Sequence, residues 1–178
     1  GREQVAQVSV ADEVMGYVMH AELDNARRVM DNAERPYTAI MGGAKISDKI
    51  LIIEKLMDRV DNLLIGGGMC YTFVKADGGQ IGSSLVEEDK VELASRLIAM
   101  AREKGVNLMI PVDSIIADEF SNDANVDTAL SHHIKPLWMG LDIGPNAREL
   151  YADVIRNSKT ILWNGPMGVF EMSNFSVG

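Results

Sequence analysis

Cysteine is almost absent from the sequence, since Cys70 is the only one among 178 residues. One thiol cannot form an internal disulfide, and no Cys/His cluster has zinc-site spacing. A reducing cytoplasm is therefore the expected location. The longest apolar stretches fall far short of the roughly 20 residues that a bilayer-spanning helix needs, and residues 1–14 lack the pattern of a secretory signal. We therefore expect no membrane as a partner.

Positive charge is also scarce, with 17 Lys and Arg against 26 Asp and Glu and a formal net charge of −9. A broad nucleic-acid surface needs clustered Lys and Arg, so nucleic acid is not an expected partner. A local pair of lysines inside a loop is still enough for one small phosphorylated ligand. The composition, 47% hydrophobic and 24% charged, is typical of a soluble globular protein.

Segments with strand character alternate with segments of helical periodicity. The predicted strands are 37–41, 62–65, 107–110, 114–118 and 160–164. The predicted helices are 14–32, 47–60, 69–75, 84–104 and 145–157. A capping box of Ser84 and Glu87 would open the fourth helix, and Gly105 would end it. Residues 119–137 are expected to form a polar loop.

This alternation predicts an α/β fold, a Rossmann-like parallel sheet with helices on both faces. Ligands of such sheets bind beyond the carboxyl ends of the strands. Glycine-rich loops follow the strands at 37–41, 62–65 and 160–164. If these strands are neighbours, the three loops converge on one edge of the sheet.

The first loop, residues 42–49, reads Gly-Gly-Ala-Lys-Ile-Ser-Asp-Lys. Glycines let backbone N–H groups approach an anion, and a helix N-terminus adds a favourable dipole. Lys45 and Lys49 are four apart, so both would lie on one helical face and meet a polyphosphate. The alternative is a tight turn with two solvated lysines. No Gly-Lys-Ser/Thr is present, so this is not the usual P-loop.

The other two loops each have two interpretations. The glycines at 66–68 either carry a flat ring such as adenine or form an ordinary strand-to-helix turn. After the last strand, Asn164 is placed to donate to a phosphate oxygen, and Glu171 to accept from ribose hydroxyls. The alternative there is a rigid Pro/Gly turn with a core Trp and Phe. Residues 138–142 are either apolar walls of a base pocket or an edge of the core.

Six segments, in order and at similar spacing, together resemble the phosphoglycerate kinase family. They are residues 42–49, 64–69, 82–87, 111–113, 138–145 and 163–171. The similarity extends over about residues 15–178. It implies that residues 37–178 are a partial nucleotide-binding domain of a two-domain kinase and that 15–36 are an interdomain-type helix and linker. The resemblance does not extend to the N-terminal segment 1–14, and the sequence assigns no structure to that segment.

The resemblance implies a glycolytic enzyme that moves the acyl phosphate of 1,3-bisphosphoglycerate to magnesium-ADP, giving 3-phosphoglycerate and ATP. Lys45 would be catalytic, neutralising the phosphoryl group in flight, and Lys49 would hold the α-phosphate. Asn164 would contact the terminal phosphates, and Glu171 the ribose hydroxyls. The remaining implied nucleotide-binding residues are Gly43, Gly66, Gly67, Gly68, Gly140, Leu141, Pro166, Gly168 and Val169.

Two parts of the family pattern are missing from this chain. One is the N-terminal domain that binds 3-phosphoglycerate. The other is a later Gly-Gly-Gly-Asp segment, whose Asp is linked to Mg²⁺. We therefore expect the fragment alone to be inactive and the full-length enzyme to be a monomer that binds ADP and ATP. The alternative is a non-catalytic nucleotide-binding module.

Overall fold

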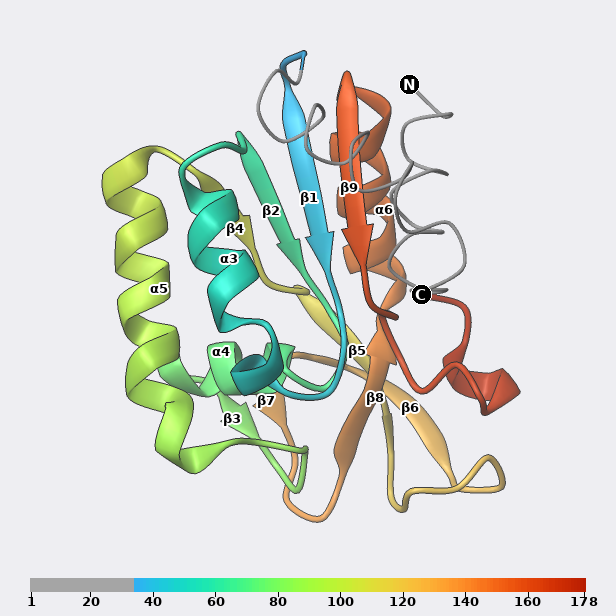
Figure 1. The fold of residues 1–178 in the computed structure, drawn as a ribbon. Coiled ribbons are helices and arrows are strands. Elements are labelled where there is room, and N and C mark those ends of the chain that lie inside the picture. The colour runs from blue at the N-terminus through green and yellow to red at the C-terminus, as the bar shows by residue number, and fades with distance from the viewer. Residues whose placement is uncertain (1–33) are drawn as a thin grey trace, which may run out of the picture.

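The computed structural model describes residues 34–178, so the helix predicted at 14–32 lies outside the described residues. The centre of the fold is a parallel sheet in the order β4-β2-β1-β9 (Figure 1). Its strands are β1 (Tyr37–Met41), β2 (Asn62–Ile65), β4 (Asn107–Met109) and β9 (Thr160–Asn164). The prediction of an α/β fold with a parallel sheet is confirmed.

Helices pack on both faces of this sheet. Their bounds are α3 (Ile50–Met57), α4 (Cys70–Ala76), α5 (Val91–Lys104) and α6 (Pro145–Arg156). Alternate strand side chains point to opposite faces. Met41 and Ile65 therefore belong to the core cluster of α3, α4 and α5, whereas Ile40 and Leu64 pack with Tyr151 of α6.

A second sheet continues from the first and was not predicted. It is antiparallel, in the order β6-β5-β8, with β5 (Asp113–Ala117), β6 (Val126–Leu130) and β8 (Met139–Ile143). Two short strands, β3 (Gln80–Ile81) and β7 (His133–Ile134), pair with each other. The expected polar loop at 119–137 is therefore wrong. Because β6 is an edge strand with mostly exposed residues, it carries no hydrophobic pattern that would reveal it.

The capping box at the start of α5 is also wrong. The helix begins at Val91, after a 3₁₀ turn η2 (Glu88–Lys90), and no side chain caps it. The Ser84 hydroxyl instead accepts the N–H of Gly140 at 2.9 Å. A partner from a distant strand has replaced the local one. The end of α5 is as predicted, because Gly105 has a left-handed φ of 70°.

A buried carboxylate joins the second sheet to α6. Asp113 of β5 accepts the N–H groups of Asn146 and Ala147 at 3.1 and 2.8 Å. These are among the first N–H groups of α6, which have no partner within the helix. Pro145 occupies the first turn of α6, as predicted. The cap fixes β5, and therefore β8 beside it, relative to the parallel sheet.

Candidate functional site

The three glycine-rich loops meet at the carboxyl edge of the parallel sheet. The N–H of Gly43 donates to the carbonyl of Pro166 at 3.1 Å, and the N–H of Gly67 donates to that of Met167 at 3.0 Å. The N–H of Met69 donates back to Gly43 at 3.0 Å. Each loop is therefore hydrogen-bonded to another, and the predicted convergence is confirmed.

Two glycines are required where these loops touch. A Cβ at Gly42 would overlap the carbonyl oxygen of Pro166, and one at Gly67 would overlap the backbone of Gly43. Gly67 also has a φ of +71°, which side chains rarely adopt. The N–H groups of Gly43 and Gly67 already donate to carbonyls. In this arrangement both glycines shape the loops, and the N–H of Gly43, which the sequence had suggested for an anion, is already used within the protein.

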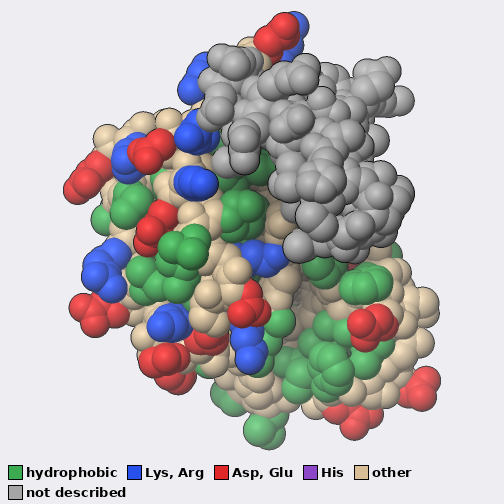
Figure 2. Space-filling view, viewed as in Figure 1, with side chains coloured by type: hydrophobic (Ala, Val, Ile, Leu, Met, Phe, Trp, Pro, Cys, Tyr) green, Lys and Arg blue, Asp and Glu red, His purple; other side chains and the backbone are tan. Residues whose placement is uncertain are grey.

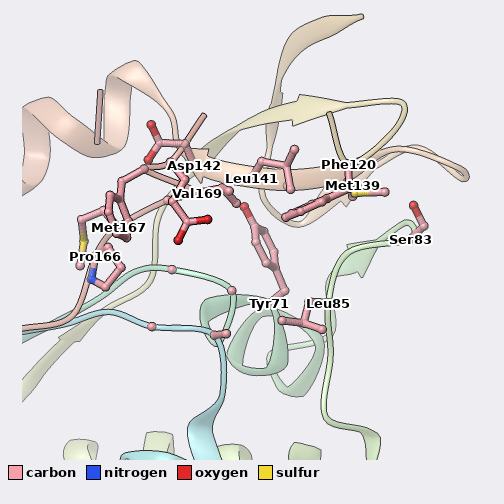
Figure 3. A pocket seen from close by; sticks show the side chains of 18 residues that line it. Tyr71, Ser83, Leu85, Phe120, Met139, Leu141, Asp142, Pro166, Met167 and Val169 are labelled. Carbon is pink, nitrogen blue, oxygen red and sulfur yellow. The ribbon is translucent and has the colours of Figure 1, made fainter. Parts of the chain in front are cut away.

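A cavity of about 500 Å³ opens between the converged loops and strand β8 (Figure 3). Its volume is in the range of small-molecule binding sites. Nine residues expected from the sequence line it: Gly43, Gly67, Gly68, Gly140, Leu141, Pro166, Gly168, Val169 and Glu171. The structure therefore brings together residues that are up to 128 positions apart in the chain, from 43 to 171.

Nine further residues line the cavity: Ala44, Tyr71, Ser83, Leu85, Phe120, Met139, Asp142, Met167 and Phe170. Met139 and Asp142 belong to the stretch 138–142, for which a pocket wall was one of the two interpretations, and the other seven were missed. Several of them lie inside the recognised segments, so the motif boundaries already contained a signal for them. Phe120 carried none, because it lies in the stretch expected to be a polar loop. Its side chain is 61% exposed beside the cavity, as is that of Phe170.

Four expected residues do not line the cavity: Lys45, Lys49, Gly66 and Asn164. The ammonium group of Lys49 donates to the side-chain oxygen of Asn164, so these two residues form a pair. The pair lies next to the cavity, since a Cβ on the lining residue Gly43 would be 3.3 Å from Cε of Lys49. Gly66 lies against Met167, which would overlap any side chain there.

The two lysines do not share a helical face. Lys45 immediately precedes a 3₁₀ turn, η1 (Ile46–Asp48), and Lys49 immediately precedes α3. Lys45 is exposed and Lys49 half-buried. The expectation of one face is wrong because the chain completes a 3₁₀ turn before the α-helix begins. Both ammonium groups nevertheless come from the loop that borders the cavity.

Tyr71 forms a wall of the cavity and is buried. Figure 3 shows its side chain rising from α4 toward Leu141 of β8. Its hydroxyl donates to Ser114 at 2.9 Å, and Ser114 is hydrogen-bonded to Ser131 at 2.7 Å. Burial raises the pKa of Tyr71 well above its ordinary value. The phenol therefore stays protonated and keeps donating to Ser114 at neutral pH.

Asp142 holds the segment after β9 against β8. Its carboxylate accepts the N–H groups of Ile143 and Gly178, both at 2.8 Å. Burial raises the pKa of this carboxyl group, although the two N–H donors partly offset the effect. Next to it, the N–H of Val169 donates to the carbonyl of Leu141 at 2.9 Å. Two neighbouring parts of the cavity lining, from β8 and from the segment after β9, are thereby tied together.

Acidic and basic side chains are interspersed over the face of the molecule that Figure 2 shows, so no single sign dominates that face. Within residues 34–178, no group of three or more His, Cys, Asp and Glu side chains is arranged to hold a metal ion. The same part of the chain contains no helix long and apolar enough to cross a membrane. What remains is a cavity lined mostly by glycine and apolar residues, with the carboxyl groups of Asp142 and Glu171 in its lining and two lysines and one amide beside it.

A parallel sheet covered on both faces, with glycine-rich loops and a cavity at its carboxyl edge, defines the class of α/β ligand-binding domains. Comparison with known families is more specific. The model of the phosphoglycerate kinase family matches residues 2–178. The chain belongs to the phosphoglycerate kinase family.

Solved structures agree with this assignment. A phosphoglycerate kinase from Coxiella burnetii is 41% identical, with a TM-score of 0.86 over 89% of this chain and 41% of that one. A phosphoglycerate kinase from Pyrococcus horikoshii OT3 is 24% identical, with a TM-score of 0.75 over 97% of this chain and 45% of that one. The second likeness concerns the fold alone. The chain spans less than half the length of either protein.

Proposed function

We propose that this chain is the nucleotide-binding part of a phosphoglycerate kinase, whose full-length form transfers a phosphoryl group between 1,3-bisphosphoglycerate and magnesium-ADP. The observation that carries the proposal is the cavity, because it gathers nine residues that the family resemblance had assigned to the nucleotide. The proposed substrates are ADP and ATP on this side and 3-phosphoglycerate on a separate domain. The proposed location is the cytoplasm.

The adenine ring would enter the apolar part of the cavity. Gly67 and Gly68 line it from the loop after β2, and Leu141 lines it from β8. Tyr71 closes the space between them (Figure 3). Contact with such flat, apolar walls removes the ring faces from water. Glu171, which also lines the cavity, would accept hydrogen bonds from the ribose hydroxyls.

The phosphates would then reach the loop that carries the lysines. Lys49 and Asn164, already paired with each other, would hold the phosphates nearest the ribose and the terminal ones, respectively. Charge-assisted hydrogen bonds of this kind are roughly twice as strong as neutral ones. Lys45 is exposed and free to reach the phosphoryl group. Gly66, which lies against Met167, would support this site without contacting the ligand.

In the proposed transfer, an ADP β-phosphate oxygen forms a bond to phosphorus as the bond from phosphorus to the acyl oxygen breaks. The electron pair of the broken bond leaves on the carboxylate of 3-phosphoglycerate. Catalysis of this kind depends on positioning and on charge stabilisation. Lys45 would supply the positive charge, and its contribution would be greatest while the phosphoryl group is in flight.

Magnesium would enter as part of the nucleotide substrate. The described residues form no carboxylate cluster that fits a metal ion, so we derive no step through a protein-bound metal. The Asp that the family resemblance links to Mg²⁺ belongs to a segment outside this sequence.

Calorimetric titration of the 178-residue chain with ADP tests the nucleotide site. We expect saturable binding that adenosine weakens by competition and that Leu141→Asp abolishes. Leu150→Asp, which alters a half-exposed leucine on α6 away from the cavity, is the matched control. Absence of ADP binding at millimolar concentration would contradict the proposal.

A second assay concerns the reaction. The chain alone, mixed with 3-phosphoglycerate and magnesium-ATP, should transfer no phosphate, because proximity of both bound substrates supplies much of the rate. The same residues within a chain of the family's full length should restore transfer. Binding without transfer in that longer chain would favour the non-catalytic module.

A further inference from the structure

Glu87 does not form the capping box expected from the sequence, and it is not among the residues proposed to contact the nucleotide. Its backbone N–H donates to Oγ1 of Thr72, a buried residue of α4, at 3.2 Å. Its carboxylate accepts the backbone N–H of Ser47 at 3.1 Å. One residue therefore joins α4 to the loop that holds Lys45 and Lys49, from 40 positions further along the chain.

This contact lies close in the chain to two residues of the cavity lining. Ala44 and Leu85 both line the cavity. A Cβ on Gly68 would lie 3.0 Å from Cδ2 of Leu85 and 3.3 Å from Cα of Ala44. The segment that ends in Glu87 therefore runs beside the loop that continues from Ala44 to Ser47.

Glu87 also brings a negative charge to this loop. Partial burial alone would raise the pKa of its carboxyl group, but hydrogen bonds from Ser47 and the nearby charge of Lys45 outweigh burial and hold the pKa below its ordinary value. Glu87 is therefore ionised at neutral pH. The lysine proposed to meet the phosphates is already within the electrostatic influence of a carboxylate.

We propose that Glu87 is a positioning residue that holds the 45–49 loop in place and, through its charge, favours a bound nucleoside diphosphate over a triphosphate. The inference rests on the proposed nucleotide site. The hydrogen bond to Ser47 fixes the loop before the ligand arrives, which lowers the ordering cost of binding. The charge opposes each further phosphate charge and competes with the phosphates for Lys45. Such a residue would help a triphosphate product to leave.

Substitutions separate the two roles. Glu87→Gln keeps an oxygen that accepts the Ser47 N–H but removes the charge. Glu88→Gln is the matched control, since Glu88 loses the same charge next in sequence but is exposed and paired with Lys75 at 2.6 Å. Glu87→Ala removes both the acceptor and the charge.

The first measurement is the affinity of the 178-residue chain for adenosine, ADP and ATP, without magnesium and at low salt. For Glu87→Gln we expect ATP to bind about 3- to 10-fold more tightly, ADP about 2- to 4-fold, and adenosine within 2-fold, since unit charges near a protein surface interact at this scale. Glu88→Gln should change all three by less than about 2-fold. An equal change for all three ligands in Glu87→Gln would overturn the charge role.

The second measurement needs no nucleotide. Amide hydrogen exchange of residues 43–49 should become at least several-fold faster in Glu87→Ala and stay near wild type in Glu87→Gln. Unchanged exchange in Glu87→Ala would overturn the positioning role. If the wild-type chain binds no ADP, the proposed function fails and the nucleotide bias fails with it, while the exchange result still decides whether Glu87 holds the loop.

Discussion

Tyr71 and Gly140 occupy adjoining space so closely that a Cβ on residue 140 would overlap the phenol oxygen and Cζ of Tyr71. Gly140 lies on β8 and Tyr71 on α4, so the missing side chain lets the two layers close around the cavity. The absence of one methyl group thus sets the position of a cavity wall.

Gly140→Ala should therefore destabilise the protein by about 1–3 kcal/mol, the usual cost of overpacking. As a single substitution, Tyr71→Leu should also lower stability, because it leaves space unfilled and removes one of the two side-chain hydrogen bonds of Ser114. The double variant should cost less than the sum of the two, since leucine leaves room for the added methyl group. Urea unfolding of the four proteins measures the coupling. Strict additivity would show that the overlap is relieved elsewhere.

Leu137 is a second position where backbone and side chain conflict. It has a φ of 70° in a turn closed by the Trp138 N–H and the Lys135 carbonyl at 3.2 Å. A left-handed backbone conformation costs a residue other than glycine about 1–2 kcal/mol. Leu137 is 80% exposed, so burial of its side chain offsets little of this cost. Leu137→Gly should raise the free energy of unfolding by up to about 1 kcal/mol.

The control for this substitution is Leu51→Gly. Leu51 is equally exposed, at 81%, but lies in α3. Glycine in a helix costs up to about 1 kcal/mol, so this variant should lose stability. Equal effects at the two positions would mean that the turn at Leu137 is not strained.

Asp142 should give the protein an unusual dependence on pH. Burial raises the pKa of this carboxyl group in the folded state, so the folded protein binds the proton more readily than the unfolded one. Its contribution to stability therefore improves as the pH falls from neutrality through the raised pKa and becomes constant below the ordinary value near 4. The usual acidic residue behaves in the opposite way.

Asp142→Asn removes this titration. The free energy of unfolding of wild type minus that of the variant should increase as the pH falls from about 7 to 4. A difference that is constant across the range would show that Asp142 titrates as it does in the unfolded chain.

In the kinase that we propose for the full-length protein, Lys45 and Lys49 should differ in their kinetic roles. Lys45→Ala should lower kcat more than it weakens nucleotide binding, because the charge it meets develops in the transition state. Lys49→Ala should weaken nucleotide binding by about 1–3 kcal/mol, the value of a charged hydrogen bond. Steady-state kinetics of both variants test this difference. Equal and small effects of the two substitutions would mean that the lysines are solvated surface residues that do not contact the nucleotide.

The elements that could be predicted from the sequence are those whose burial leaves a local pattern. Strand β9 is a short apolar run that ends in Asn164 and a glycine turn, and β1 and β2 have the same form. Parallel topology then dictates that their loops meet. Strand β6 shows the limit, because an exposed edge strand has no apolar alternation.

Within the site, the features that could not be predicted are contacts between residues far apart in the sequence. The Lys49–Asn164 pair spans 115 positions, and no spacing rule reaches that far. At the Ser84 hydroxyl, a local partner and a distant one compete for the same hydrogen bond. Its local pattern suited a helix cap, but the N–H of Gly140 is a partner that only the folded chain provides.

The cap that Asp113 places on α6 has a consequence for how the domain comes apart. The carboxylate belongs to the antiparallel sheet, whereas α6 packs on the parallel one. Separating the two sheets would therefore break both hydrogen bonds and leave these helix N–H groups without their acceptor. Partial opening along this seam is accordingly disfavoured, and the two sheets should melt as a single cooperative unit despite their different architectures.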